Sequence, residues 1–183
     1  MRDVKADILN FWFDEIQPEQ WFQKSDDFDR QIIDRFATDF DQAVQGKFDG
    51  WTDIAEGSLA LIILLDQFSR NMFRDTPKAF SGDDKALAVA RQSVEQGFDQ
   101  TLEPSKRSFM YLPFEHSEDM DDQKRCVELF EAMKEDHPLG YDYALRHMAV
   151  IEQFGRFPHR NAILGRENTD EEAVYLAQPG AGF

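Results

Sequence analysis

One segment of the sequence is apolar on every side, and it constrains the fold more than any other. Residues 55–71 are expected to form a helix, and the run from Leu59 to Leu65 leaves that helix without a polar face. A helix that is hydrophobic all round is stable only when other elements surround it. The run is far shorter than the ~20 residues that cross a bilayer. We therefore expect a water-soluble helical protein with this helix at its centre.

The rest of the chain also has helical periodicity, and no segment alternates with the period of a half-buried strand. Cap signals mark the helix ends: Asp26, Ser117 and a Thr169–Glu172 capping box at starts, and Gly46 at an end. Short loops favour antiparallel packing of neighbouring helices. The expected helices cover residues 3–15, 26–46, 55–71, 81–97 or 83–97, a short stretch from Pro104 through Leu112, 117–135, 138–154, and a short stretch after Thr169.

The charge of the chain bears on its partners. The formal net charge is −16 at pH 7. Nucleic acids and anionic membranes are polyanions that would repel such a surface, so we expect neither as a partner. Seventeen residues are phenylalanine, which supplies ample core material and argues against disorder in spite of the high charge.

The length of 183 residues suits a single domain, 1–183, with a flexible tail at 178–183. The single cysteine, Cys126, cannot form an internal disulfide, and the N-terminus has no signal-peptide core. These features favour a cytoplasmic location. They do not define an oligomeric state.

A short polar motif occurs twice, each time at the end of an apolar run. Residues 66–70 read Asp-Gln-Phe-Ser-Arg, and residues 152–156 read Glu-Gln-Phe-Gly-Arg. An acid, an amide and an arginine at the end of a buried helix are costly to desolvate unless they pair or bind something. The repetition indicates one polar site between two similar helical units.

Three segments carry the candidate binding residues. The first follows the central apolar run, the second surrounds His116, and the third is an arginine-rich stretch from residue 154 to residue 166. Arginine is preferred where a planar fork binds a carboxylate or a phosphate at two points. The candidate ligand-binding residues are Asp66, Gln67, Arg70, Asn71, Glu115, His116, Arg156, His159, Arg160, Asn161 and Arg166.

The same arginines have a structural alternative. They could pair internally with acidic residues and form a buried brace, because ion-pair networks bury charges as readily as functional sites do. The acidic partners considered for such a brace are Asp66, Glu115, Glu118 and Glu152.

The histidines leave catalysis open. His116 or His159 could act as a general base oriented by a carboxylate, with Glu115 the nearest candidate. For each histidine taken alone, a core position bonded to the backbone is the more common alternative. Glu115, His116, Asp119 and His147 have no recognised metal-ligand spacing, and nearby arginines would repel a cation, so we expect no metal and no cofactor.

Long motifs run through almost the whole chain: Phe11–Phe13, Trp21–Phe22, Leu61–Asn71, Leu112–Asp119, Phe154–Asn161 and Leu164–Arg166. Together they resemble the bacterial domain-of-unknown-function family 924. The resemblance implies an all-α, tetratricopeptide-like fold, an irregular array of about seven to nine antiparallel-packed helices. It implies no activity.

The leading hypothesis is therefore a helical protein that binds a small anion, a carboxylate or a phosphate. The ligand would lie between Arg70, Arg156, Arg160 and His159, with Glu115 and His116 opposite. One alternative is a metal-independent hydrolase or lyase that uses His116 or His159 with Glu115. The other is a peptide-binding scaffold, as helical-repeat folds often are.

Overall fold

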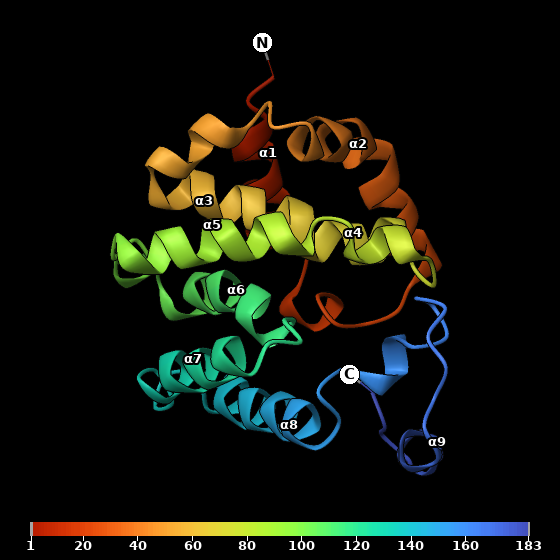
Figure 1. The fold of residues 1–183 in the computed structure, drawn as a ribbon. Helices are drawn as coiled ribbons and strands as arrows, with labels where there is room; N and C mark the ends of the chain where they lie inside the picture. Colours follow the sequence, from red (N-terminus) through yellow and green to blue (C-terminus); the bar gives the residue numbers. More distant parts are fainter. Residues whose placement is uncertain (1, 183) are drawn as a thin grey trace. The chain divides into compact units, whose positions relative to one another are not determined.

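The computed structural model describes residues 2–182 and contains only helices, turns and irregular segments over that range (Figure 1). It divides into two compact units. The N-terminal unit comprises residues 1–74 and 78–113, and the C-terminal unit comprises residues 75–77 and 114–183. The prediction of an all-α fold is confirmed. The tetratricopeptide-like label and the single domain stay predictions.

The N-terminal unit is built on the expected central helix, which is interrupted by a π-helical turn. α3 (Ala55–Ile62) continues through the π turn Ile63–Phe68 into α4 (Ser69–Met72). Every residue from Leu59 to Phe68 is buried, as the apolar run predicts. The remaining helices of this unit are α1 (Val4–Asn10), α2 (Asp26–Val44), α5 (Asp83–Glu95) and most of α6 (Pro104–Glu115).

Aromatic rings fill the interior of the N-terminal unit. Phe68 contacts three other rings, with centroid distances of 5.9 Å to Phe11, 5.5 Å to Trp12 and 4.8 Å to Phe36. All four side chains are at most 1% exposed. Edge-to-face and tilted packing of this kind adds specific contacts to the burial of apolar area. The central helix therefore packs against α1, the turn Phe11–Glu15 that follows α1, and α2.

The C-terminal unit contains a helical hairpin. α7 (Met120–Glu131) and α8 (Pro138–Phe154) lie side by side and are joined by residues 132–137 (Figure 1). A 3-10 turn, Pro158–Arg160, and the short helix α9 (Asp170–Leu176) follow. The capping box of Thr169 and Glu172 at the start of α9 is confirmed. Along residues 2–182, no helix combines the length and the hydropathy that a membrane crossing requires.

Several expected helix ends are wrong by one or two residues. Ser25, not Asp26, caps α2, with its hydroxyl accepting from the Phe28 amide. Asp119, not Ser117, caps α7. In both cases a neighbouring short polar side chain accepts the first-turn N–H groups in place of the expected residue. The helix expected over residues 3–15 is α1 followed by a π-helical turn, Phe11–Glu15.

One glycine of the central helix allows a close contact with the turn that precedes it. A Cβ atom on Gly57 would lie 2.1 Å from the carbonyl oxygen of Trp51, which is a backbone atom and cannot rotate away. We expect Gly57→Ala to lower the free energy of unfolding by about 1–3 kcal/mol, the usual cost of overpacking. A Cβ on Gly50 would meet no atom within 4 Å. Gly50→Ala is therefore the control in urea denaturation, and equal costs for the two variants would contradict the contact.

Candidate functional site

The candidate binding residues fall in both units. Asp66, Gln67, Arg70 and Asn71 belong to the N-terminal unit. The others belong to the C-terminal unit, which brings the second and third polar segments together: Glu115, His116, Arg156, His159, Arg160, Asn161 and Arg166. A single cleft lined by both sets stays a prediction.

Arg70 is held by carboxylates of its own unit. Its two terminal nitrogens each lie 3.0 Å from a carboxylate oxygen of Asp83, and one of them donates to the Asp66 carbonyl at 2.6 Å. The carboxylate of Asp66 is fully buried and lies 3.2 Å from the same guanidinium. The two-point pairing of Arg70 with Asp83 is the geometry in which an arginine would bind the carboxylate of a ligand. In the N-terminal unit, Arg70 therefore has the contacts expected of a brace.

The neighbouring amides are also engaged. Asn71 donates to Asp29 at 2.8 Å, and Arg74 donates to both oxygens of the same carboxylate at 2.8 Å. Burial would raise the pKa of Asp29, but the bonds from Arg74 and Asn71 outweigh it and lower the pKa below its usual value. Gln67 donates to the Asp66 carboxylate at 2.6 Å. These contacts join α2 to the end of the central helix.

In the C-terminal unit, Glu118 and Arg166 clamp the backbone of Phe157. Arg166 bonds both oxygens of Glu118, at 2.7 and 3.0 Å. Glu118 accepts the Phe157 N–H at 2.8 Å, and Arg166 donates to the Phe157 carbonyl at 3.0 Å. The pair therefore satisfies both polar backbone groups of one residue. The pKa of Glu118 is lowered because the Arg166 bonds outweigh the effect of burial.

Arg156 pairs with a different carboxylate, that of Glu172. Its Nε and one terminal nitrogen donate to the two oxygens of Glu172 at 2.6 and 2.8 Å. Glu172 also accepts from the Thr169 backbone at 2.8 Å and from Asn161 at 3.2 Å. These bonds, with that of Arg156 the largest, lower the pKa of Glu172 to about 2. Arg156 and Asn161 thus tie the turn after α8 to α9.

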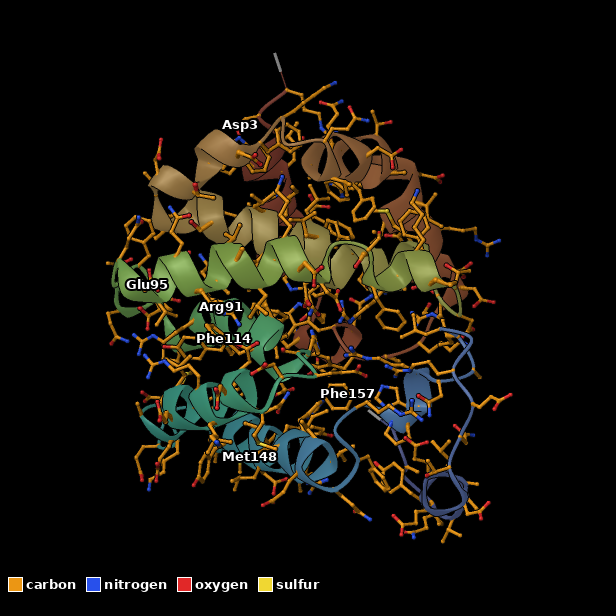
Figure 2. All side chains as sticks on the ribbon, in the orientation of Figure 1. Asp3, Arg91, Glu95, Phe114, Met148 and Phe157 are labelled. Atoms are coloured by element: carbon orange, nitrogen blue, oxygen red, sulfur yellow. The ribbon has the colours of Figure 1, made fainter. Side chains whose placement is uncertain are left out.

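A different group of side chains surrounds the Phe157 ring, which Figure 2 labels. The rings of His147 and His159 each lie 5.6 Å from it, between centroids, and the Arg160 guanidinium lies over it at 4.5 Å. Phe157 is fully buried and Arg160 is 8% exposed, whereas His159 is partly exposed. We refer to Phe157, His147, His159 and Arg160 as the Phe157 cluster. It places three basic side chains around one apolar ring.

The Phe157 cluster is joined to Glu115 through His147. Nδ1 of His147 lies 2.9 Å from the Tyr143 carbonyl and 3.5 Å from a carboxylate oxygen of Glu115. A carbonyl only accepts, so Nδ1 carries the hydrogen and Nε2 is the basic nitrogen of the neutral ring. Both side chains are 6% exposed. This arrangement fixes the tautomer of a buried histidine beside a carboxylate.

Both histidines of the Phe157 cluster are held in the neutral form. Burial, followed by the charges of His116, His159 and Arg160, lowers the pKa of His147 to about 3. Burial and the charge of Arg160 lower the pKa of His159 to about 4. His116 is therefore close enough to act electrostatically on both rings. A bound anion would oppose these effects and favour protonation.

Two other kinds of chemical site, a metal site and a reactive thiol, can be examined in the structure. In the part of the chain that the structure describes, no group of three histidine, cysteine, aspartate or glutamate side chains is placed to hold a metal ion. The thiol of Cys126 is buried, and burial raises its pKa well above the usual value. Such a thiol is a poor nucleophile because its thiolate form is disfavoured.

Comparison with known proteins identifies the family. The family model of DUF924, described as a bacterial protein of unknown function, matches residues 8–180. The chain belongs to DUF924. A solved structure similar to this DUF924 chain is that of a protein of unknown function, ATU0120 from Agrobacterium tumefaciens. The two are 41% identical with a TM-score of 0.91, over 96% of this chain and 98% of the other. No curated protein matches this chain.

The DUF924 sequence does not predict several of these ion-pair partners. Asp83 binds Arg70 from 13 residues away, and Glu172 binds Arg156 from 16 residues away, so no local spacing predicts either pair. Glu118 was considered as a brace residue and does bind Arg166. The spacing of four residues between His147 and Ile151, on the buried face of α8, indicates that His147 lies inside the unit, and its ring does bond the Tyr143 carbonyl. The sequence does not predict the contact of His147 with Glu115.

Proposed function

We propose that this DUF924 protein binds a small anion, a carboxylate or a phosphate, at the Phe157 cluster. The observation that supports this is the convergence of two histidine rings and one guanidinium on the buried ring of Phe157. Neutral histidines beside a fixed positive charge can take up protons as an anion enters, so binding adds favourable charge pairs. The partly exposed His116 and His159 are the side from which a ligand would approach.

This proposal is narrower than the one that the sequence suggested. Arg156 and Arg166 each bind a carboxylate of their own unit through two nitrogens. We therefore assign them to positioning. Arg160 is the arginine of the third segment that faces the Phe157 ring.

Anion-induced stabilisation tests the proposal. Phosphate or succinate at about 10 mM should raise the melting temperature, by mass action on the native state. The effect should be larger at pH 5 than at pH 7, because the histidines protonate as the anion binds. Arg160→Gln should weaken anion affinity about tenfold, the effect of losing one charged hydrogen bond of ~1.4 kcal/mol.

The matched control is Arg146→Gln. Arg146 is 61% exposed and pairs with Asp142 on the same helix, so its replacement should leave the anion effect unchanged. Loss of the effect in both variants would indicate general charge screening. Absence of stabilisation in the unsubstituted protein would refute anion binding.

A second candidate function is metal-independent acid–base catalysis, and one contact favours it. His147 and Glu115 form a carboxylate–histidine pair with a fixed tautomer. This pair differs from the one that the sequence suggested, in which Glu115 acts with His116 or His159. A catalytic His147 would make His147→Gln lose turnover in a hydrolase and lyase screen while anion affinity is retained.

A further inference from the structure

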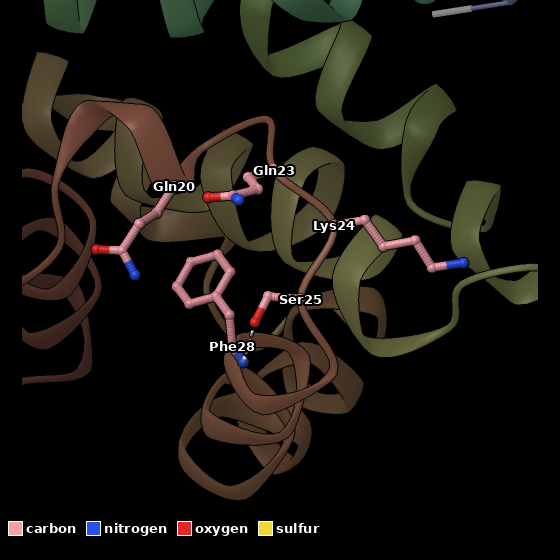
Figure 3. Close-up of a pocket in the computed structure, with 5 residues that line it drawn as sticks. All are labelled: Gln20, Gln23, Lys24, Ser25 and Phe28. Atoms are coloured by element: carbon pink, nitrogen blue, oxygen red, sulfur yellow. Dashed lines mark hydrogen bonds between the residues drawn. The ribbon is translucent and has the colours of Figure 1, made fainter.

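Two features of the surface lie outside the ion pairs and the Phe157 cluster. One is the hollow drawn in Figure 3, in the N-terminal unit beside the first turn of α2. There Ser25 accepts the Phe28 N–H, and Phe28 is 3% exposed, so these two side chains start and anchor the helix. The other is the tail of the C-terminal unit, of which the structure describes residues 178–182. It runs back from α9 to His159 (Figure 1).

The tail reverses its direction directly after α9. Residues 178–181 read Gln-Pro-Gly-Ala, and the Ala181 N–H donates to the Gln178 carbonyl at 3.2 Å. A proline at the second position and a glycine with positive φ at the third are typical of a type II turn, and the φ of Gly180 is 79°. The local sequence therefore encodes the reversal.

After this turn, the backbone of Gly182 lies against the side chain of His159. A Cβ atom on Gly182 would be 3.2 Å from Cβ of His159 and 3.5 Å from its Cγ. Residues 177–180 are exposed, whereas Ala181 and Gly182 are partly buried. The tail and the Phe157 cluster belong to the same unit. Residues 181–182 therefore cover part of the His159 side chain.

The tail is held weakly in this position. Among the residues that the structure describes, the bond from Ala181 to Gln178 is the one hydrogen bond of residues 179–182. A single hydrogen bond shifts an opening equilibrium by only about tenfold. By contrast, Glu172 ties α9 to Arg156 through two bonds and to the Thr169 backbone through a third. The tail can therefore lift while α9 stays in place.

We propose that residues 181–182 are a displaceable cover of His159, which must lift before a ligand reaches the Phe157 cluster. The proposal rests on the anion-binding function proposed above and adds an intramolecular competitor at the same site. A ligand that binds only the open form has its apparent affinity reduced by the fraction of open molecules. The tail thus sets the anion concentration at which the site fills.

Gly180→Val tests the cover, because it disrupts the turn and adds nothing beside His159. A Cβ atom at residue 180 would meet no atom within 4 Å, so the substitution acts through the unfavourable φ alone. Deletion of residues 178–183, which leaves α9 whole, is the second variant. Gly97→Val is the matched control: Gly97 has a φ of 71° and equally open surroundings, but it belongs to the N-terminal unit.

The first measurement is the rate at which diethyl pyrocarbonate modifies His159 at pH 7, followed by peptide mapping. Burial and the charge of Arg160 lower the pKa of His159 to about 4. The ring is therefore neutral at pH 7, and the rate reports access to it. We expect the rate to rise by up to about tenfold in both tail variants and to stay unchanged in Gly97→Val. The second measurement is phosphate affinity from melting temperatures, which should rise by a similar factor in the same two variants.

The two measurements separate the cover from the anion site. An unchanged rate of His159 modification in both tail variants would overturn the cover. Faster modification with unchanged phosphate affinity would also overturn the proposal, because the ligand would then reach the cluster without displacing the tail. Faster modification without phosphate stabilisation in any variant would support the cover of His159 and refute anion binding at the Phe157 cluster.

Discussion

Acidification from pH 7 to pH 5 should lower the free energy of unfolding by about 2 kcal/mol for each of His147 and His159. The ordinary histidine pKa is 6.5, and the folded values are about 3 and about 4. Between pH 6.5 and 4 the unfolded chain binds protons at these positions and the folded chain does not. Stability therefore falls as the pH falls through this window.

Urea denaturation at pH 7 and at pH 5 measures the effect. His147→Gln and His159→Gln should each remove about half of the histidine contribution, and the double variant should remove nearly all of it. Stopping at pH 5 leaves the Glu172 contribution nearly unchanged, because that carboxylate contributes stability that is lost only as the pH falls from about 4.5 toward about 2. A double variant with undiminished pH dependence would show that these rings do not stay neutral in the folded protein.

Removal of the Glu118 carboxylate should lower the free energy of unfolding by about 3 kcal/mol, at the low end for breaking a buried ion pair. The side chains of Glu118 and Arg166 are 29% and 23% exposed, so solvent reduces the cost. Glu118→Ala leaves both the Arg166 guanidinium and the Phe157 N–H without this acceptor. The lost stability should exceed that of the ion pair alone, because Glu118 and Arg166 also bond the backbone of Phe157.

Glu128→Ala provides the comparison. Glu128 pairs with Arg125 on the exposed side of α7, with the two side chains 64% and 47% exposed. Such surface pairs contribute about 0–1 kcal/mol. A double-mutant cycle with Arg166→Ala isolates the coupling of Glu118 to its partner. Similar losses in Glu118→Ala and Glu128→Ala would mean that the clamp contributes no more than an ordinary surface pair.

Capping signals and residue spacing predicted the helices better than they predicted the ion-pair partners of the charged residues. The glycines at the helix ends and the capping box at Thr169 depend on neighbouring residues, and sequence spacing captures them. Gly155 has a φ of 67° at the left-handed end of α8, where glycine is favoured because it lacks a Cβ atom.

The candidate site could be predicted only in part, because its charges are paired by tertiary contacts. The arginine-rich stretch does carry the functional candidate Arg160, but its composition does not separate that residue from Arg156. The difference depends on Glu172, which reaches Arg156 only after the chain has turned and started α9. Likewise, the sequence makes Glu115 a candidate, whereas its contact with His147 depends on how residue 115 faces α8.

The π-helical turn in the central helix has a consequence for how the chain tolerates changes in length. Such a turn holds one residue more than an α-helical turn, so deleting one residue between Ile63 and Phe68 could restore regular hydrogen bonding. Because the wider turn absorbs its extra residue, the residues that follow would keep nearly the same facing after the deletion. Arg70 would still face Asp83, and Asn71 would still face Asp29. This turn is therefore the place in the buried central helix where we expect the loss of one residue to disturb the following contacts least.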